Sequence, residues 1–286
     1  GFYHPTEAPL NPYLIEGPAL ISFSGGRTSG YMLKHILDAH GGTLPGDVIV
    51  SFQNTGKEMP ETLDFVRDCG ERWGVEIVWL EYFVPEGGFP TFRQVDYESA
   101  SRNGEPFMAL TDYYERLPNP AQRFCTGKLK IEVLKWYAKD LGFDDFNNAV
   151  GLRADEPRRV WRVNDTTPNY MNTVCPLATA GITKNDVAEW WKIRNFDLAL
   201  LGVDGNTPLG NCDLCYLKGI QTVAGIIRQR PDLAEWWIKM EERYSTAKGG
   251  FCAARPSYRQ LLEYSKSQID LFDGMDDETI PCFCTD

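Results

Sequence analysis

The stretch "ISFSGGRTSGYML", residues 21–33, decides the fold because its hydrophobic period changes within a few positions. An apolar run over residues 18–23 stops at Ser24, and apolar side chains return at helical spacing from Tyr31. A glycine-rich turn between a strand and a helix presents backbone N–H groups to an anion, and the helix dipole adds to the attraction. On these residues alone the turn is either such an anion site or an ordinary turn with a Ser or Thr helix cap.

Apolar runs and helical periods alternate along the chain on both sides of this turn. Strands are predicted at 18–24, 47–53, 76–83 and 146–152, and helices at 28–40, from Pro60, at 126–141 and after a capping box at Thr183. This order is typical of βαβ units, so we predict an α/β fold with a Rossmann-like parallel sheet and helices on both faces. Residues 84–124 break the rhythm and are expected to pass over the active face.

Three regions are predicted. Residues 1–17 would form an N-terminal arm, 18–205 a nucleotide-binding domain and 206–286 a cysteine-containing helical region. In the last region helical patterns occur at 216–229, 232–245 and 257–267.

The charge and hydropathy of the chain limit its partners. A net charge of −11 over 286 residues argues against a broad nucleic-acid surface, although four arginines within residues 153–162 leave room for a local patch. The sequence shows neither a membrane-length apolar run nor a secretory signal, so a cytoplasmic protein without membrane contact is expected.

The eight cysteines favour metal or redox chemistry over a disulfide framework, because the chain is long and carries no export signal. Cys212 and Cys215 have the two-residue spacing of a zinc site, a redox pair or an iron–sulfur site. All three histidines precede residue 41, which argues against a local Cys/His zinc finger. Cys69 is predicted to be a core residue, and the roles of Cys282 and Cys284 stay open.

Five motifs in order resemble a known family. "SFSGGRTS" (22–29) resembles the PP-loop, SGGxDS, of the adenine nucleotide α-hydrolase superfamily. Four stretches are similar to motifs of its phosphoadenosine phosphosulfate (PAPS) reductase family, namely "FQNTGKEMPETLDFV" (52–66), "RFCTGKLKI" (123–131), "VGLRADEPRR" (150–159) and "GNCDLCYLKG" (210–219). The resemblance implies an adenine nucleotide α-hydrolase-like fold and an enzyme of sulfur transfer or sulfonucleotide reduction that binds ATP or PAPS.

The resemblance also implies roles for individual residues. The nucleotide would be bound by Ser24, Gly25, Gly26, Arg27, Thr28, Ser29, Asn54, Thr55, Gly56 and Arg153. Cys125 and Arg153 are expected to take part in catalysis. A [4Fe-4S] cluster, with zinc as the alternative metal, would be held by Cys125, Cys212 and Cys215, with Cys175 as the fourth candidate and an open iron or the tail cysteines as the other options. Asp155 and Glu156 would hold Mg²⁺ or pair with Arg158 and Arg159, and pairing is favoured.

Two departures from the family pattern keep other functions open. Thr28 stands where the PP-loop has Asp, and the reductases' C-terminal Glu-Cys-Gly-Leu-His motif is absent from the sequence. The alternatives are a non-catalytic, nucleotide-responsive protein with structural zinc and an FAD-synthetase-like adenylyltransferase. The sequence does not identify the sulfur acceptor, which is a small molecule or a locally docked nucleic acid. It also does not identify the electron donor or show whether the protein forms a homo-oligomer.

Overall fold

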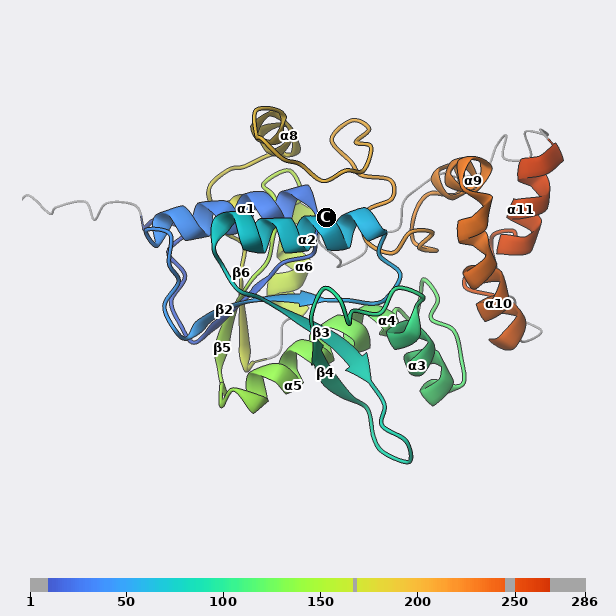
Figure 1. Cartoon of the computed structure of the whole chain (residues 1–286), viewed down its shortest axis with the longest axis horizontal. Helices are drawn as coiled ribbons and strands as arrows, with labels where there is room; N and C mark the ends of the chain where they lie inside the picture. The colour runs from blue at the N-terminus through green and yellow to red at the C-terminus, as the bar shows by residue number, and fades with distance from the viewer. Residues whose placement is uncertain (1–9, 167–168, 245–249, 268–286) are drawn as a thin grey trace, which may run out of the picture.

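A six-stranded sheet forms the centre of the molecule in the computed structural model, which describes residues 10–166, 169–244 and 250–267 (Figure 1). The strands are β1 Ala19–Ser22, β2 Val48–Gln53, β3 Ile77–Phe83, β4 Thr91–Val95, β5 Phe146–Ala149 and β6 Met171–Val174. Their order is β4-β3-β2-β1-β5-β6, and all neighbours are parallel except β3 and β4. The chain therefore builds outward from β1 to β4 and then returns to the other side of β1.

The helices connect and cover these strands. They are α1 Arg27–Ala39, α2 Pro60–Trp73, α3 Glu105–Tyr114, α4 Phe124–Thr126, a π-helix at Gly127–Glu132, α5 Val133–Asp140, α6 Pro157–Thr166, α7 Pro176–Thr179, α8 Lys184–Lys192, α9 Ile220–Gln229, a 3-10 helix at Pro231–Leu233, α10 Ala234–Tyr244 and α11 Tyr258–Ser267.

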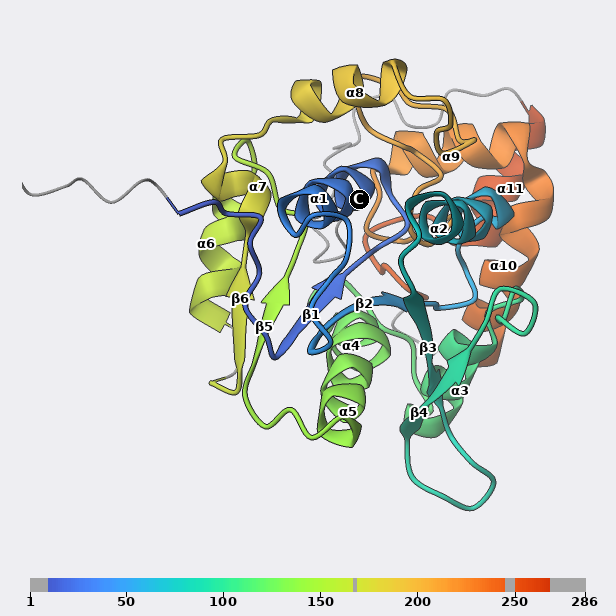
Figure 2. The ribbon, with the colours of Figure 1, turned by 60° about the vertical axis from the view of Figure 1, so that its left-hand side comes forward.

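Helices cover both faces of the sheet, with α1, α2 and α8 on one face and α3 and α5 on the other (Figures 1 and 2). Alternate strand residues supply the two cores, since neighbouring side chains of a strand point to opposite faces. Ile21 packs in the core under α1 and α2, whereas Leu20 packs in the opposite core. Tyr258 of α11 also belongs to the core of Leu20, so the C-terminal helices share a hydrophobic core with the sheet.

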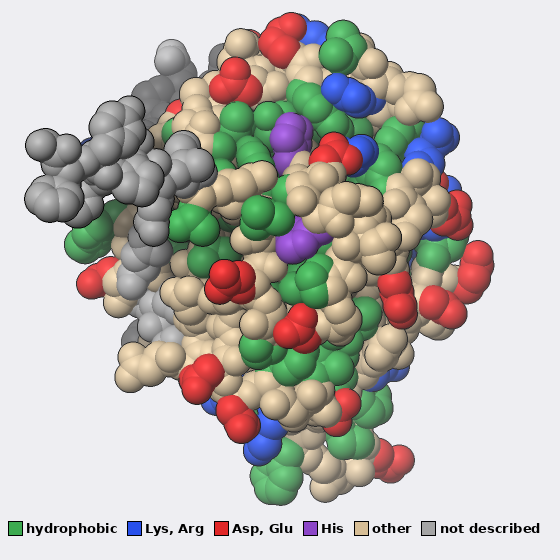
Figure 3. All heavy atoms as spheres, turned by 90° about the vertical axis from the view of Figure 1, so that its left-hand side faces the viewer, with side chains coloured by type: hydrophobic (Ala, Val, Ile, Leu, Met, Phe, Trp, Pro, Cys, Tyr) green, Lys and Arg blue, Asp and Glu red, His purple; other side chains and the backbone are tan. Residues whose placement is uncertain are grey.

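The α/β fold and the helical C-terminal region predicted from the sequence are confirmed. The sequence patterns did not predict α3 and β4 within residues 84–124, nor α6, β6 and α7. Strand β4 is partly exposed at the antiparallel edge of the sheet, and only one residue of β6 is buried, so neither gives a strong apolar signal. Within the described residues, no helix is long and apolar enough to cross a membrane. The face in Figure 3 carries both acidic and basic side chains, and the acidic ones are more widespread, in keeping with the net charge of −11.

Candidate functional site

The predicted glycine-rich loop lies at the point where the strand order of the sheet reverses. The loop follows β1, and the segment leading to Arg153 follows β5, the next strand in the sheet. Ser22 Oγ donates a hydrogen bond of 2.8 Å to Asn148 Oδ1 and ties these two strands together near their carboxyl ends. Open α/β sheets bind ligands at such a switch point.

The backbone of the loop leaves the start of α1 open. Gly25 has φ +80°, and a Cβ there would lie 2.7 Å from Thr62 Cγ2, so only glycine fits. Gly26 precedes α1 with φ −102°, an extended conformation that any residue can adopt. Among the described residues, no side chain caps α1. Ser29 Oγ instead donates to the Gly26 carbonyl (3.1 Å) and lies 2.9 Å from Ser24 Oγ.

The Arg27 side chain points away from the loop and binds the segment after α8. Its guanidinium pairs with both carboxylate oxygens of Asp197 at 2.8 and 3.0 Å. It also donates to Thr207 Oγ1 and to the carbonyls of Leu198 and Leu200. Any contribution of Arg27 to ligand binding would therefore come from its backbone N–H.

Arg153 lies directly beside the loop. Its guanidinium, which is almost fully buried, donates to Thr28 Oγ1 at 3.0 Å and pairs with Asp155 at 3.0 Å and with Glu156 at 3.5 Å. Glu156 also pairs with Arg159, as the pairing interpretation expected, whereas Asp155 pairs with Arg153 itself. Burial tends to raise the pKa of Asp155, but the Lys184 N–H and the Arg153 guanidinium outweigh it and lower that pKa overall.

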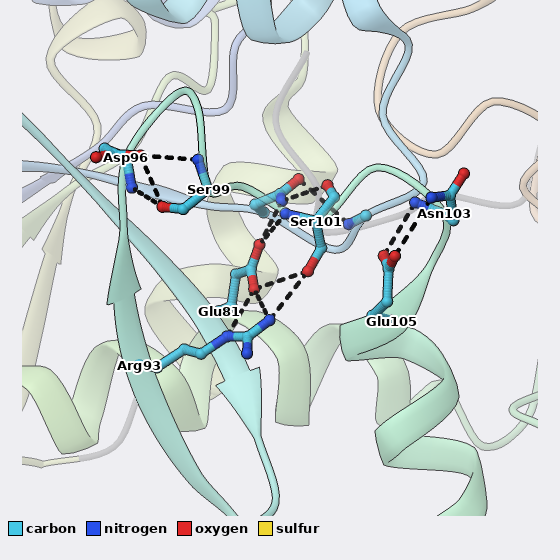
Figure 4. A network of polar contacts seen from close by, with 9 residues as sticks. Glu81, Arg93, Asp96, Ser99, Ser101, Asn103 and Glu105 are labelled. Atoms are coloured by element: carbon cyan, nitrogen blue, oxygen red, sulfur yellow. Dashed lines mark hydrogen bonds and ion pairs between the residues drawn. The ribbon is translucent and has the colours of Figure 1, made fainter.

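Asn54, Thr55 and Gly56 form the loop after β2, and a buried carboxylate on β3 holds that loop (Figure 4). Glu81 is fully buried and accepts from Asn54 Nδ2 at 2.7 Å and from the Ser101 N–H at 2.7 Å, and it pairs with Arg93 at 2.7 Å. Asn54 also donates to the Ser101 carbonyl and accepts from the Gly56 N–H. Sequence reasoning missed Glu81, although a charged residue inside the apolar strand "IVWLEYF" was the available signal.

The same loop contacts the two-cysteine motif. Thr55 Oγ1 donates to the Glu58 carboxylate at 2.9 Å and lies 3.5 Å from Cys212 Sγ. Glu58 and Cys212 also form an isolated antiparallel bridge. Burial raises the pKa of Glu58, and the charge of Lys130 opposes that rise. The Cys212 turn thus lies at the carboxyl end of β2, although 157 residues separate Thr55 from Cys212.

The other predicted cysteines lie on two further segments. Cys125 is buried on α4, with its Sγ 3.4 Å from the hydroxyl of Tyr216, the residue that follows Cys215. A six-residue π-helix begins two residues after Cys125. Cys175 is buried at the end of β6, and burial together with the charge of Glu156 raises its pKa to about 11. Cys69 is a core residue of α2, as expected, and burial raises the pKa of its thiol.

The predicted metal site is not assembled in the part of the chain that the structure describes. Across residues 10–166, 169–244 and 250–267, no three His, Cys, Asp or Glu side chains form a group that could hold a metal ion. Cys282 and Cys284 lie outside the described residues. Thiols fit an iron–sulfur cluster or zinc in their chemistry, but their arrangement here does not form a ligand set.

The fold and site define an α/β protein with a glycine-rich loop and a buried arginine at the switch point of its sheet. The chain is 30% identical over 210 residues to the uncharacterized nin region protein ORF290 of Escherichia phage lambda, and the match covers 71% of this chain and 67% of the phage protein. The chain belongs to the family of that phage protein. It is also 30% identical over 142 residues to the uncharacterized protein MJ0066 of Methanocaldococcus jannaschii, a match that covers 50% of this chain and 24% of the archaeal protein.

No protein-family model matches the chain. Among solved structures, the fold is similar to the U34-tRNA thiolase NcsA from Methanococcus maripaludis with its [4Fe-4S] cluster, with a TM-score of 0.41, 14% identity and coverage of 93% of this chain and 78% of that one. It is similar to the PAPS reductase from Candida auris in a phosphate complex, with a TM-score of 0.37, 17% identity and coverage of 64% and 79%.

Proposed function

We propose that this chain is a PP-loop enzyme that binds an adenine nucleotide, ATP or PAPS, between the carboxyl ends of β1 and β5 and acts in sulfur transfer or sulfonucleotide reduction. One observation carries the proposal: the buried Arg153 guanidinium hydrogen-bonds Thr28 beside the open start of α1. A fixed cation next to N–H groups that no described side chain caps is suited to phosphate or sulfate oxygens.

Different residues of the site would make different contacts with the phosphate or sulfate group. The N–H groups at the start of α1 and the hydroxyls of Ser24 and Thr28 would donate to the oxygens of the anion. Asp155 and Glu156 hold the Arg153 fork in place, so that little side-chain freedom is lost when the anion binds. Arg153 would also stabilise negative charge that develops on a phosphoryl or sulfuryl group during the reaction.

The cysteines are proposed to supply the sulfur or redox chemistry, with Cys125, Cys212 and Cys215 as the first set and Cys175 as a fourth. Because the described thiols form no ligand set, we assign no step of the reaction to a cluster. The contact between Thr55 and Cys212 is the observation that relates the cysteines to the loop after β2.

One preparation tests the proposal. The protein is purified anaerobically, and its affinity for ATP and PAPS is measured by calorimetry beside its iron and acid-labile sulfide content. Release of AMP from [α-³²P]ATP would identify adenylylation followed by sulfur transfer, and sulfite from PAPS would identify sulfonucleotide reduction. A folded protein that binds neither nucleotide would overturn the proposal. Nucleotide binding without turnover, together with zinc in place of iron, would favour the non-catalytic alternative.

A further inference from the structure

A buried ion pair joins the loop after β2 to the turn between Cys212 and Cys215. Lys57 Nζ lies 3.0 Å from Asp213 Oδ2, and the two side chains are 8% and 6% exposed. Lys57 follows the Asn54–Gly56 loop directly, and Asp213 is the first residue between the two cysteines. The pair therefore connects the loop after β2, predicted to bind the nucleotide, to the two-cysteine motif, proposed to supply sulfur or redox chemistry.

Several directional contacts surround this pair. The Asp213 N–H donates to the Lys57 carbonyl at 2.9 Å, and Asp213 Oδ1 accepts from Trp237 Nε1 at 2.8 Å and from the Leu214 N–H at 2.6 Å. The Lys57 ammonium lies 4.7 Å from the ring centroid of Trp236. Both carboxylate oxygens of Asp213 are thus used, and helix α10 covers the pair from one side.

A buried ion pair is a poor means of gaining stability, because desolvation of the two charges offsets most of their attraction. The directional contacts lie on Asp213 instead, since its N–H and both its carboxylate oxygens are bound by Lys57, Trp237 and Leu214. Thr55 contacts Cys212 while Lys57 contacts Asp213, so alternate residues of the loop bind successive residues of the turn. A slip of one residue would break both contacts.

We propose that Lys57 and Asp213 are positioning residues that fix the Cys212–Cys215 turn at the end of β2 and so set its place relative to the nucleotide loop. The inference rests on the proposed function for its purpose but concerns only how the turn is held. The pair borders a cavity of about 430 Å³ between the loop and α10, whose lining includes Trp236 and Arg230. Reagents in solvent can therefore reach this region once the turn is released.

The test compares thiol reactivity in variants that stay folded. Lys57→Met/Asp213→Asn removes both charges, and the Asn carbonyl can still accept from Trp237 and Leu214, so no buried charge loses its partner. Arg230→Met is the matched control, because it removes another cation that borders the same cavity, and its partner Asp232 is exposed and stays hydrated. Lys57→Arg tests rescue by a conservative cation. Iodoacetamide labelling of each native protein is followed by mass spectrometry, peptide by peptide.

We expect labelling of Cys212 and Cys215 to rise about tenfold or more in the double variant, while labelling of Cys252 and the melting temperature change little. Lys57→Arg should keep most of the protection, and Arg230→Met should leave it unchanged. Wild-type labelling in the folded double variant would overturn the proposal, as would an equal rise in Arg230→Met or an equal rise at Cys252. Nucleotide affinity is measured in parallel: its absence in the wild type would refute the proposed function without affecting this result.

Discussion

The Arg153 guanidinium and the Thr28 hydroxyl meet at 3.0 Å, although 125 residues separate them in the chain. The contact joins the segment after β5 to the first turn of α1 and places a buried cation beside the glycine-rich loop.

Arg153→Ala should weaken nucleotide binding by about 10- to 100-fold, because a hydrogen bond to a charged group contributes roughly 1.5–3 kcal/mol. Calorimetry with ATP and PAPS measures the loss, and Arg158→Ala, which changes an exposed arginine at the start of α6, serves as the control. A large fall in melting temperature with unchanged affinity would instead make Arg153 a structural residue.

Gly25 and Gly26 should respond differently to substitution. Gly26→Val should fold, because φ −102° suits any residue, yet it should abolish nucleotide binding by filling the space in front of the N–H groups. Gly25→Ala should lower the free energy of unfolding by about 1–2 kcal/mol from its left-handed conformation alone, and the contact with Thr62 adds to this. Urea denaturation and calorimetry separate the two effects. Unchanged ATP and PAPS affinity in folded Gly26→Val would show that the loop is a simple turn and does not bind the nucleotide.

Iron content should depend on Cys125, Cys212 and Cys215, and replacing any of them by Ser should remove the absorbance near ~400 nm expected of a thiolate-ligated cluster. Cys175→Ser decides the fourth position, and we expect it to lose iron as well. Full iron in Cys175→Ser would favour an open iron site. Cys69→Ser is the control, because Cys69 lies in the core of α2. Wild-type iron and sulfide in all four site variants would refute the assignment of these cysteines as cluster ligands.

Stability should fall in mild acid because of His35, whose ring stacks on Tyr31 with centroids 4.0 Å apart. Burial lowers the pKa of His35, and the charges of Lys34 and Arg194 lower it further, against opposing effects of the Tyr31 carbonyl and Asp38. The unfolded chain thus takes up a proton near pH ~6.5 while the folded protein does not, so stability is lost as the pH falls from that value through the folded pKa. His35→Phe should reduce this loss between about pH 7 and 5 in urea denaturation. If the free energy of unfolding falls by the same amount in both proteins over this pH range, the expectation is wrong.

The sheet and the loop could be predicted because their signals are local. The change of hydrophobic period around Ser24 is visible in the sequence, and the capping box at Thr183 is present as predicted, with Asp186 as its partner. Strand β4 could not be found in the same way, because its pairing with β3 depends on a partner strand and not on its own partly exposed residues.

The site was only partly predictable because side-chain direction depends on tertiary contacts. Arg27 was predicted to bind the nucleotide because it lies within the glycine-rich loop. Its guanidinium instead pairs with Asp197 and points away from the loop. Arg153 was expected at a strand end, yet its contact with Thr28 requires β1 and β5 to be neighbours. The ion pair of Lys57 and Asp213 could not be predicted, because a contact between residues far apart in the chain has no local sequence pattern.

The π-helix at Gly127–Glu132 determines where the segment between Cys125 and α5 can lose a residue. A π-turn holds one residue more than the α-helical turn it replaces, so deleting a single residue here would restore regular winding. Because the wider turn already takes up the extra residue, this deletion would leave Cys125 facing nearly the same direction relative to α5. A one-residue deletion within the regular helix α5 has no wide turn to absorb it and would rotate the Cys125 side by about 100°, so the thiol would face away from Tyr216.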